Sequence, residues 1–291
     1  MANIFAFIDF ILCLKLAYAP SYPQMLATFP CLVQIADRNG SHLCGGALLQ
    51  SNAVLSSAGC LQPYALGRKL KTLVVQAGCP HSPSYQEKRV RLVHIHDKYN
   101  SVLKKNELAV IILTSNVKNT LHSRPIAFPP RPAIAGENCF YPTYDTISER
   151  FPYNISFLPM VIRKRNLCKH PELENKICVD SRKAVFGTCK GDNGGPLICK
   201  NLLYGLSYKT VEVCTKLPEL FTEIYPHREW IRRMILISTR SSRSLGLSRS
   251  SEIEVSLPFT GVYIMKIIFC TFTCAVNVLY FFKWHSLAFM C

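Results

Sequence analysis

One glycine-rich stretch gathers the residue types best suited to chemistry. It runs from Gly187 to Cys199 and reads GTCKGDNGGPLIC, so that Asp192 and Asn193 stand side by side between glycines. Asn193 carries an amide, which has no ionisable hydroxyl group. A neighbouring base therefore cannot convert this side chain into an alkoxide that attacks a carbonyl group.

The stretch resembles the nucleophile loop of trypsin-like (chymotrypsin-fold) serine proteases, whose core reads Gly-Asp-Ser-Gly-Gly-Pro. Every residue of that core is present except the serine, which Asn193 replaces. Two further motifs of the family precede it in the expected order. Ala53–Cys60 matches the segment that usually ends Ala-Ala-His-Cys, with Gly59 in the place of the histidine. Lys105–Leu113 matches the strand that carries the triad aspartate, with Glu107 in its place.

The resemblance covers about residues 28–235. It implies an all-β fold of two six-stranded antiparallel β-barrels of the chymotrypsin type with a C-terminal helix. That helix is expected over Pro226–Ile235, because the apolar residues at 230, 231, 234 and 235 would share one helical face. The former active cleft would lie between the two barrels.

The three triad positions determine the predicted function. Gly59 can neither accept nor donate a proton and Asn193 is no nucleophile, so both the base and the nucleophile are absent. Glu107 keeps a carboxylate that is one methylene longer, but the histidine that it would orient is missing. We therefore expect an inactive serine protease homologue that acts by protein binding. Inactive members of this family are often reproductive-tract proteins. The alternative is an active serine endopeptidase, which would need a displaced nucleophile and base.

The substrate pocket also departs from the family pattern. Gly187 takes the place of the acidic residue that gives trypsin its preference for basic side chains. Lys209 and Glu219 stand where the family has glycines in the pocket walls. Two long charged side chains should either fill the pocket or point out of it.

Fourteen cysteines in 291 residues indicate an oxidising compartment and a disulfide framework. Cys31 and Cys79 are one candidate pair, because the strands that carry them should be neighbours. Asn39-Gly-Ser and Asn154-Ile-Ser are glycosylation sequons if the chain is exported. The resemblance implies four further bridges, namely Cys44–Cys60, Cys139–Cys199, Cys168–Cys178 and Cys189–Cys214.

The ends of the chain suggest export. Residues 1–19 resemble a signal peptide, residues 20–235 form the protease-homology domain, and residues 236–257 form a Ser/Arg-rich linker. Residues 258–283 are apolar and long enough to span a bilayer, which needs about 20 residues. A lipid-anchor signal and a splice-derived tail without a selected role are the alternatives for this segment. The protein would be secreted or held at the cell surface.

One further hypothesis concerns activation. In this family a new terminal amine pairs with the aspartate that precedes the serine. Removal of the signal peptide would expose an amine close to Asp192.

The charge balance favours anionic partners, since 34 Lys and Arg residues stand against 18 Asp and Glu, a net charge of +16. An anionic glycan of the heparin type is one candidate, and an ordinary solvated basic surface is the other interpretation. No nucleic-acid motif accompanies the charge, and we expect neither a metal site nor a cofactor. The two basic clusters that such a glycan would use are Arg68, Lys69 and Lys71, and Arg163, Lys164 and Arg165.

Overall fold

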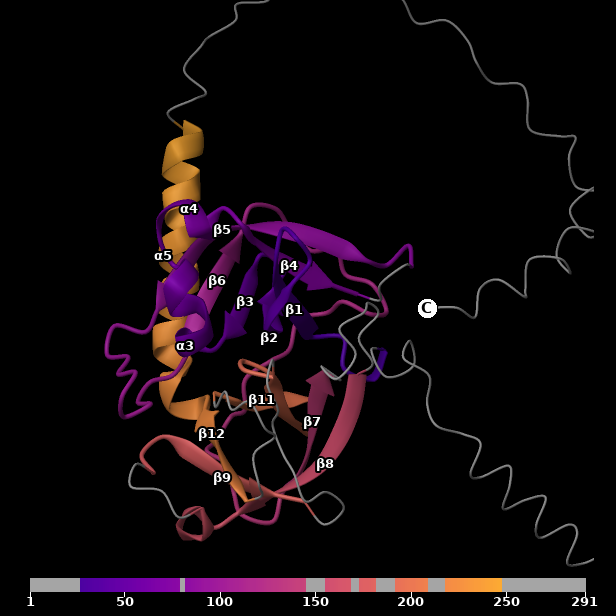
Figure 1. Ribbon diagram of the computed structural model, residues 1–291, viewed down its shortest axis with the longest axis vertical. Helices are drawn as coiled ribbons and strands as arrows, with labels where there is room; N and C mark the ends of the chain where they lie inside the picture. The colour runs from indigo at the N-terminus through magenta and orange to yellow at the C-terminus, as the bar shows by residue number, and fades with distance from the viewer. Residues whose placement is uncertain are drawn as a thin grey trace, which may run out of the picture. The chain divides into compact units, whose positions relative to one another are not determined.

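The computed structural model describes residues 27–78, 82–144, 155–168, 173–181, 192–208 and 218–247. The chain divides into two units, residues 1–236 and residues 237–291. The first unit holds two closed six-stranded antiparallel barrels, which lie one above the other in Figure 1. This architecture confirms the fold that the sequence motifs predicted.

Barrel 1 closes in the strand order β1-β2-β3-β6-β5-β4. Strands β1, β3, β4 and β6 are short and rich in Val, Ile and Leu, and the β-branched residues among them favour extended backbone. Strand β6 is buried at every position because successive side chains point to opposite faces and both faces are covered. The strands are β1 (Leu32–Asp37), β2 (His42–Gln50), β3 (Ala53–Ser56), β4 (Leu73–Ala77), β5 (Gln86–Ile95) and β6 (Ala109–Leu113); between β3 and β4 lie α3 (Ala58–Leu61), η1 (Gln62–Tyr64) and α4 (Gly67–Leu70).

Barrel 2 closes in the order β10-β11-β12-β9-β8-β7. The β10–β11 hairpin turns through Lys200 and Asn201, whose φ angles of 52° and 60° fit a two-residue turn that follows the strand twist. Inside the barrel the rings of Tyr141 and Phe221 meet edge-on at 5.1 Å. The strands are β7 (Asn138–Tyr144), β8 (Ile155–Arg163), β9 (Lys176–Asp180), β10 (Pro196–Cys199), β11 (Leu202–Leu206) and β12 (Glu219–Glu223), with the short helix η2 (Arg165–Leu167) after β8.

Helix α5 (Arg228–Leu247) follows the short helix η3 (Tyr225–His227). Trp230, Ile231, Met234 and Ile235 are buried in one cluster with residues of β6 and β11, as their spacing predicted. The helix continues to Leu247, into the segment that the sequence suggested was a linker. Residues 236–247 contain no proline and several good helix formers, so the backbone hydrogen bonds can continue.

Other predicted segments lie outside the described residues. These are the signal peptide over 1–19, the apolar segment over 258–283 and the sequon at Asn154. In the part of the chain that the structure describes, no helix is long and apolar enough to cross a membrane.

Three of the predicted disulfides are present. Cys44–Cys60 joins β2 to α3, Cys139–Cys199 joins β7 to β10, and Cys168–Cys178 connects the end of the η2 segment to β9. The partners Cys189 and Cys214 both lie outside the described residues. The bridges therefore fasten barrel 2 across two of its strands and barrel 1 beside the first triad position.

The predicted pairing of Cys31 with Cys79 is wrong, because Cys31 is a free, buried thiol. Cys31 packs with Phe29 and Ile198. Strand β4 ends at Ala77, and Gly78 then adopts a φ of 85°, which ends the register that would have placed the two cysteines opposite each other. Burial raises the pKa of the Cys31 thiol to about 12, because a buried site disfavours the charged thiolate.

Candidate functional site

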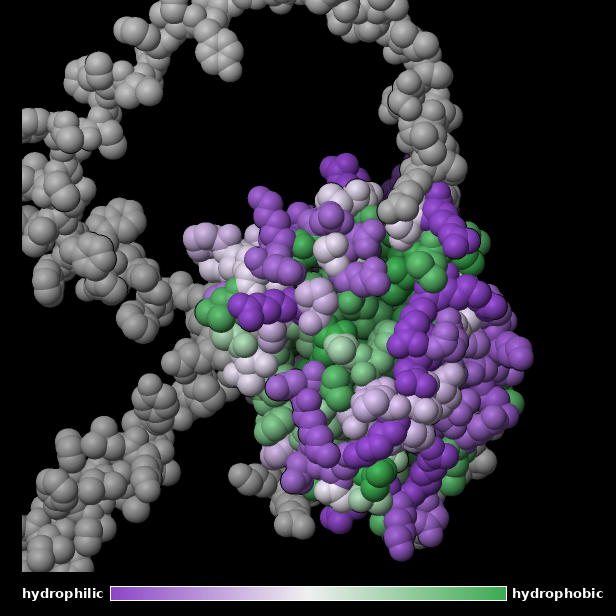
Figure 2. Space-filling view, turned by 180° about the vertical axis from the view of Figure 1, so that it is seen from behind, coloured by the Kyte–Doolittle hydropathy of each residue, from purple (hydrophilic) through white to green (hydrophobic). Residues whose placement is uncertain are grey.

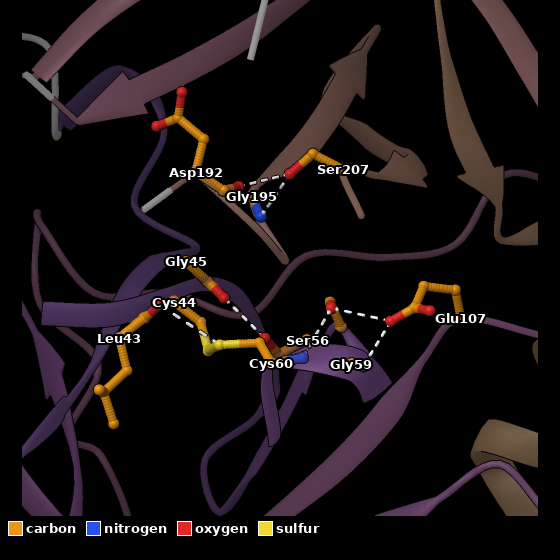
Figure 3. Close-up of a disulfide and its surroundings, with 11 residues drawn as sticks. Leu43, Cys44, Gly45, Ser56, Gly59, Cys60, Glu107, Asp192, Gly195 and Ser207 are labelled. Atoms are coloured by element: carbon orange, nitrogen blue, oxygen red, sulfur yellow. Dashed lines mark hydrogen bonds between the residues drawn. A yellow bond between two sulfur atoms is a disulfide. The ribbon is translucent and has the colours of Figure 1, made fainter. Parts of the chain in front are cut away.

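The place of the general base is occupied by a backbone contact. Gly59 lies in α3, just after the N-cap residue Ser57. Glu107 is fully buried, and its Oε1 accepts hydrogen bonds from the backbone N–H of Gly59 and, at 3.1 Å, from the Ser57 hydroxyl (Figure 3). A side chain at position 59 would begin 2.8 Å from Glu107 Oε1 and 3.0 Å from the Tyr99 hydroxyl. The longer carboxylate therefore fills the space where a histidine would start.

The carboxylate also acts on its surroundings. It accepts a free N–H in the first turn of α3, where negative charge is favourable. Tyr99 has its pKa raised by burial, by the charge of Glu107 and by a hydrogen bond to that carboxylate. The second oxygen, Glu107 Oε2, is buried and has no hydrogen-bond partner. In place of a histidine, the Glu107 carboxylate is therefore paired with Ser57 and with the backbone of Gly59.

The place of the nucleophile keeps its backbone frame. Asn193 is 4% exposed, and its carbonyl oxygen accepts the N–H of Gly45 at 2.8 Å. Gly194 follows with a φ of 79°, and a side chain there would collide with Ser56 and the Gly45 carbonyl. Only glycine fits that position. The Asn193 Oδ1 atom is buried and has no hydrogen-bond partner among the described residues.

Among the residues at the predicted triad positions, Gly59 and Glu107 are in contact, and the loop that carries Asn193 lies against Gly45 and Ser56. Ser57 bonds to Glu107 and immediately precedes α3, while the adjacent Ser56 borders the loop at Gly194. Figure 3 shows Gly59 and Glu107 together on one side and Asp192, Gly195 and Ser207 on the other. The predicted triad positions therefore hold a glycine, a buried glutamate and a buried asparagine.

A hydrogen-bonded frame holds the loop in barrel 2. The Tyr141 hydroxyl donates to the Asp192 carbonyl at 3.0 Å, and the Ser207 hydroxyl donates to the same oxygen. The Gly194 N–H donates to the Ser207 carbonyl at 2.8 Å. Asp192 is buried and 1% exposed. The hypothesis that a terminal amine pairs with it concerns residues outside the described part of the chain.

The pocket region holds buried charge. Glu219 begins β12 and is 7% exposed, so it lies inside rather than pointing out. Lys176, which sequence reasoning missed, is 1% exposed; its Nζ donates to the Lys104 carbonyl at 2.7 Å and to the Thr222 hydroxyl at 3.2 Å. The same Nζ lies 3.7 Å from the centre of the Tyr208 ring. The pocket positions Gly187 and Lys209 lie outside the described residues.

The pKa of the Tyr208 hydroxyl is affected by these buried charges. Burial first, and then the charges of Glu107 and Glu219, raise its pKa to about 12. In the sequence, the burial of Lys176 is indicated only by its position directly before the apolar strand residues Ile-Cys-Val. No local motif distinguishes such a lysine from an exposed one.

His96 and His227 are packed against aromatic rings. His96 stacks on Trp230 at 4.5 Å and meets His227 edge-on at 5.3 Å. Burial lowers the pKa of His96, and it lowers that of His227 to about 4. One serine–histidine contact occurs elsewhere among the described residues, with Ser84 Oγ 3.1 Å from His122 Nδ1. Within the same described ranges, no cluster of three potential metal-ligating side chains occurs.

The predicted surface residues are placed as follows. Asn39 is exposed in the turn between β1 and β2, so its sequon is accessible. Arg68, Lys69 and Lys71 are exposed on α4 and directly after it. Arg163 and Arg165 are both engaged in ion pairs, with Asp180 at 3.5 Å and Glu223 at 2.7 Å.

Comparison with known proteins relates this site to one family. The family model described as Trypsin matches residues 21–231. The chain is 27% identical to the thrombin-like enzyme bilineobin of Agkistrodon bilineatus, over 68% of this chain and 87% of that protein. It is also 27% identical to the thrombin-like enzyme halystase of Gloydius blomhoffii, over 70% of this chain and 90% of that protein.

Solved structures show the same architecture. Human heparin binding protein superposes with a TM-score of 0.62 at 23% identity, covering 74% of this chain and 93% of that chain. Neuropsin, a serine protease expressed in the limbic system of mouse brain, superposes with a TM-score of 0.61 at 23% identity, covering 72% and 96%. At this identity the likeness is one of fold.

Proposed function

Because this chain belongs to the trypsin family, we propose that it is a catalytically inactive member that acts by binding a protein partner rather than by cleaving peptide bonds. One observation carries the proposal. The Glu107 carboxylate accepts the backbone N–H of Gly59 and lies where a side chain at position 59 would have to begin. In this proposal, the Glu107 carboxylate occupies the space that a histidine at position 59 would need.

The two substitutions fit each other. A histidine at position 59 would bring its Cβ within 2.8 Å of Glu107 Oε1, closer than such contacts normally allow. Shortening Glu107 to aspartate would withdraw the carboxylate by about 1.5 Å, one C–C bond. A working base therefore needs both changes, and a nucleophile needs a third change at Asn193.

The residual rate enhancement expected of such a protein is small. Without nucleophile and base, an enzyme of this type keeps at most the contributions of its oxyanion hole and of substrate binding, about 10³–10⁴-fold over water. The buried charges of Lys176 and Glu219 also alter the pocket that would receive a substrate side chain. The retained loop frame around Asp192 serves the fold, and it leaves a rigid surface for a partner.

The proposed cellular location follows from the cysteines and the glycosylation sequons. Three disulfides are consistent with a secreted or cell-surface protein. A reproductive-tract location and a membrane or lipid attachment through residues 258–283 remain part of the proposal.

The test is active-site labelling. The secreted protein is treated with a fluorophosphonate probe and with a mixed peptide substrate library, beside the single variant Asn193→Ser and the triple variant Gly59→His/Glu107→Asp/Asn193→Ser. We expect no labelled serine in the wild type or in the single variant, and labelling at position 193 in the triple variant. Stoichiometric labelling of any serine in the folded wild type, with hydrolysis that the probe abolishes, would overturn the proposal.

An active endopeptidase is the second candidate, because bilineobin and halystase are named as enzymes. The contact between Ser84 and His122 supplies a serine beside a histidine. Within the described residues, however, no carboxylate is hydrogen-bonded to His122, and Ser84 also lies 2.6 Å from Ser82 Oγ. If trace hydrolysis is detected, Ser84→Ala decides its origin: loss of the activity would support a displaced nucleophile, and we expect no change.

A further inference from the structure

The positive charge is distributed unevenly between the barrels. Residues 27–124, which build barrel 1 and its connections, include twelve Lys and Arg but only four Asp and Glu. The described residues of barrel 2, between 127 and 227, include six of each kind. Over the full sequence of 127–227 there are 13 Lys and Arg against 10 Asp and Glu, so barrel 1 carries the larger excess of positive charge. A concentrated excess of one sign creates a field that attracts anions.

Four of the six cations in the described part of barrel 2 form ion pairs with carboxylates of the same barrel. Arg131 and Lys200 share the carboxylate of Glu137, at 2.7 and 3.0 Å. Arg163 and Arg165 are paired with Asp180 and Glu223, and Glu223 is 1% exposed. The predicted anion-binding cluster Arg163-Lys164-Arg165 therefore offers mainly Lys164, and it is a poor site for a polyanion.

Barrel 1 contains a group of exposed cations that we name the α4 cluster. None of its members forms an ion pair with any residue that the structure describes. The nearby carboxylates are engaged by neutral donors: Asp37 accepts N–H groups of its own turn, and Glu87 accepts from Gln76 and Tyr85. The cluster comprises Arg38, Arg68, Lys69, Lys71 and Arg89.

The topology of the barrel gathers these residues. Strand β4 pairs with β1 on one side, where Leu73 faces Asp37, and with β5 on the other, where Val74 faces Arg89. Arg38 directly follows Asp37, and Lys71 precedes Leu73 by two residues. Neighbouring strands lie about 4.8 Å apart, so Arg38 and Arg89 start from rows about 10 Å apart with β4 between them.

Helix α4 adds its cations to the same edge. It ends at Leu70, immediately before Lys71, and it contacts β5. In Figure 1 the labels of α4 and β5 lie next to each other at the upper edge of barrel 1. Arg68 and Lys69 occupy one turn of this helix and are exposed. The three segments that carry the five cationic side chains thus meet at the same end of barrel 1.

We propose that the α4 cluster is a binding face for a sulfated, glycosaminoglycan-type polysaccharide, separate from the former active cleft. Arginine guanidinium groups can bind sulfate oxygens through two parallel hydrogen bonds, and lysine ammonium groups act as mobile point charges along a flexible polyanion. Because the face does not involve Gly59, Glu107 or Asn193, it is independent of whether the cleft is catalytic.

The surroundings of the cluster favour a polysaccharide over other anions. Among the described residues from 58 to 95, Leu66 is the one large apolar side chain that is exposed, at 85%. Protein interfaces usually have an apolar or aromatic centre, and membrane-surface helices bury an apolar face. By contrast, the face seen from behind in Figure 2 has an apolar area at its centre with hydrophilic side chains around it. The α4 cluster offers charge without such an apolar centre.

The test compares two variants with the same loss of charge. The cluster variant is Arg68→Gln/Lys69→Gln/Lys71→Gln/Arg89→Gln, and the control variant is Lys98→Gln/Lys118→Gln/Lys164→Gln/Arg232→Gln, all exposed positions. Binding of the secreted proteins to immobilised heparin is measured over a series of salt concentrations. We expect the cluster variant to bind about tenfold more weakly with a shallower salt dependence, and the control to stay within about threefold of wild type. Circular dichroism and thermal melts verify that both variants fold.

Three outcomes would overturn the proposal. Equal losses in the two variants would show that net charge alone drives binding. Equal binding to desulfated heparin would exclude recognition of sulfate. Tighter binding of polyglutamate or of phosphatidylserine vesicles than of heparin would identify an acidic protein or a membrane as the partner. The fluorophosphonate result does not enter this comparison, so the two proposals can fail separately.

Discussion

The two barrels share one strand topology but are stabilised in different ways. Barrel 1 has a large aliphatic core, one disulfide and a free buried cysteine, and its cations are mostly unpaired on the surface. Barrel 2 has two disulfides, and its ion pairs include the buried carboxylate of Glu223. The same closed sheet can therefore balance its charge internally or leave it available to a partner.

The largest expected difference concerns the disulfides. Removing the β7–β10 bridge with Cys139→Ser/Cys199→Ser should lower the free energy of unfolding by about 2–5 kcal/mol, because the unfolded chain gains freedom. Cys31→Ala in barrel 1 should cost only about 1 kcal/mol, since it deletes one sulfur from the core. Urea unfolding followed by fluorescence measures both. A larger loss for Cys31→Ala would contradict the comparison.

The second prediction concerns the contact between the barrels through His227, which meets His96 of barrel 1. Burial first, and then the charges of His96 and Lys176, lower the pKa of His227 from 6.5 to about 4. The unfolded chain binds this proton near pH 6.5 and the folded protein only near pH 4. This histidine therefore leaves the free energy of unfolding undiminished above pH 6.5. That free energy should fall by up to about 3 kcal/mol as the pH drops from 6.5 to 4.

The variant His227→Gln checks this pH dependence. Its melting temperature should decline less than that of the wild type between pH 7 and pH 4.5. Parallel curves for the two proteins would assign the acid sensitivity to other groups.

The third prediction tests the rebuilt base position in barrel 1. Alanine in place of glycine normally stabilises a helix by about 1 kcal/mol. Gly59→Ala should instead destabilise the protein by about 1–3 kcal/mol, because the new Cβ meets Glu107 Oε1 at 2.8 Å. In the Glu107→Asp background the same substitution should be neutral or stabilising. Additive effects in the double-mutant cycle would mean that the two positions are independent.

The smallest expected changes in stability distinguish a cation in an ion pair from a cation outside any described ion pair. Arg165→Ala in barrel 2 should cost about 1 kcal/mol, since it leaves the buried Glu223 carboxylate with only the Ala133 N–H. The expected loss of stability is small because the Arg165 side chain is half exposed, so solvent weakens its ion pair with Glu223. Arg68→Ala in barrel 1 should change stability by less than about 0.5 kcal/mol, and it should reduce heparin affinity instead. Thermal melts and heparin binding of both variants check the contrast.

Much of the fold could be predicted from local sequence. A strand within Lys105–Leu113 and the helix with the apolar spacing of Trp230, Ile231, Met234 and Ile235 both appear where expected. These features are encoded over a few residues, so a single chain segment is enough to identify them. The extension of α5 to Leu247 was missed because serine and arginine are compatible with either a helix or a linker.

The pairing of distant residues was less predictable. The Cys31–Cys79 bridge failed because Gly78 turns the chain after β4, a backbone angle that the cysteine spacing does not reveal. The basic run Arg163-Lys164-Arg165 had the appearance of a free cluster. Two of its members are paired with Asp180 and Glu223, which come from other strands.

The sequence by itself determined that this chain is a trypsin-family scaffold, and its resemblance to the family predicted Gly59 and Asn193 at the base and nucleophile positions, because the identity of a side chain limits its chemistry wherever it lies. Only the tertiary structure decided that Glu107 reaches the Gly59 N–H, that Lys176 is buried beneath Tyr208 and that the α4 cluster is left unpaired. Those outcomes depend on distances between segments far apart in the chain. Barrel closure sets those distances, and side-chain length then decides which groups meet.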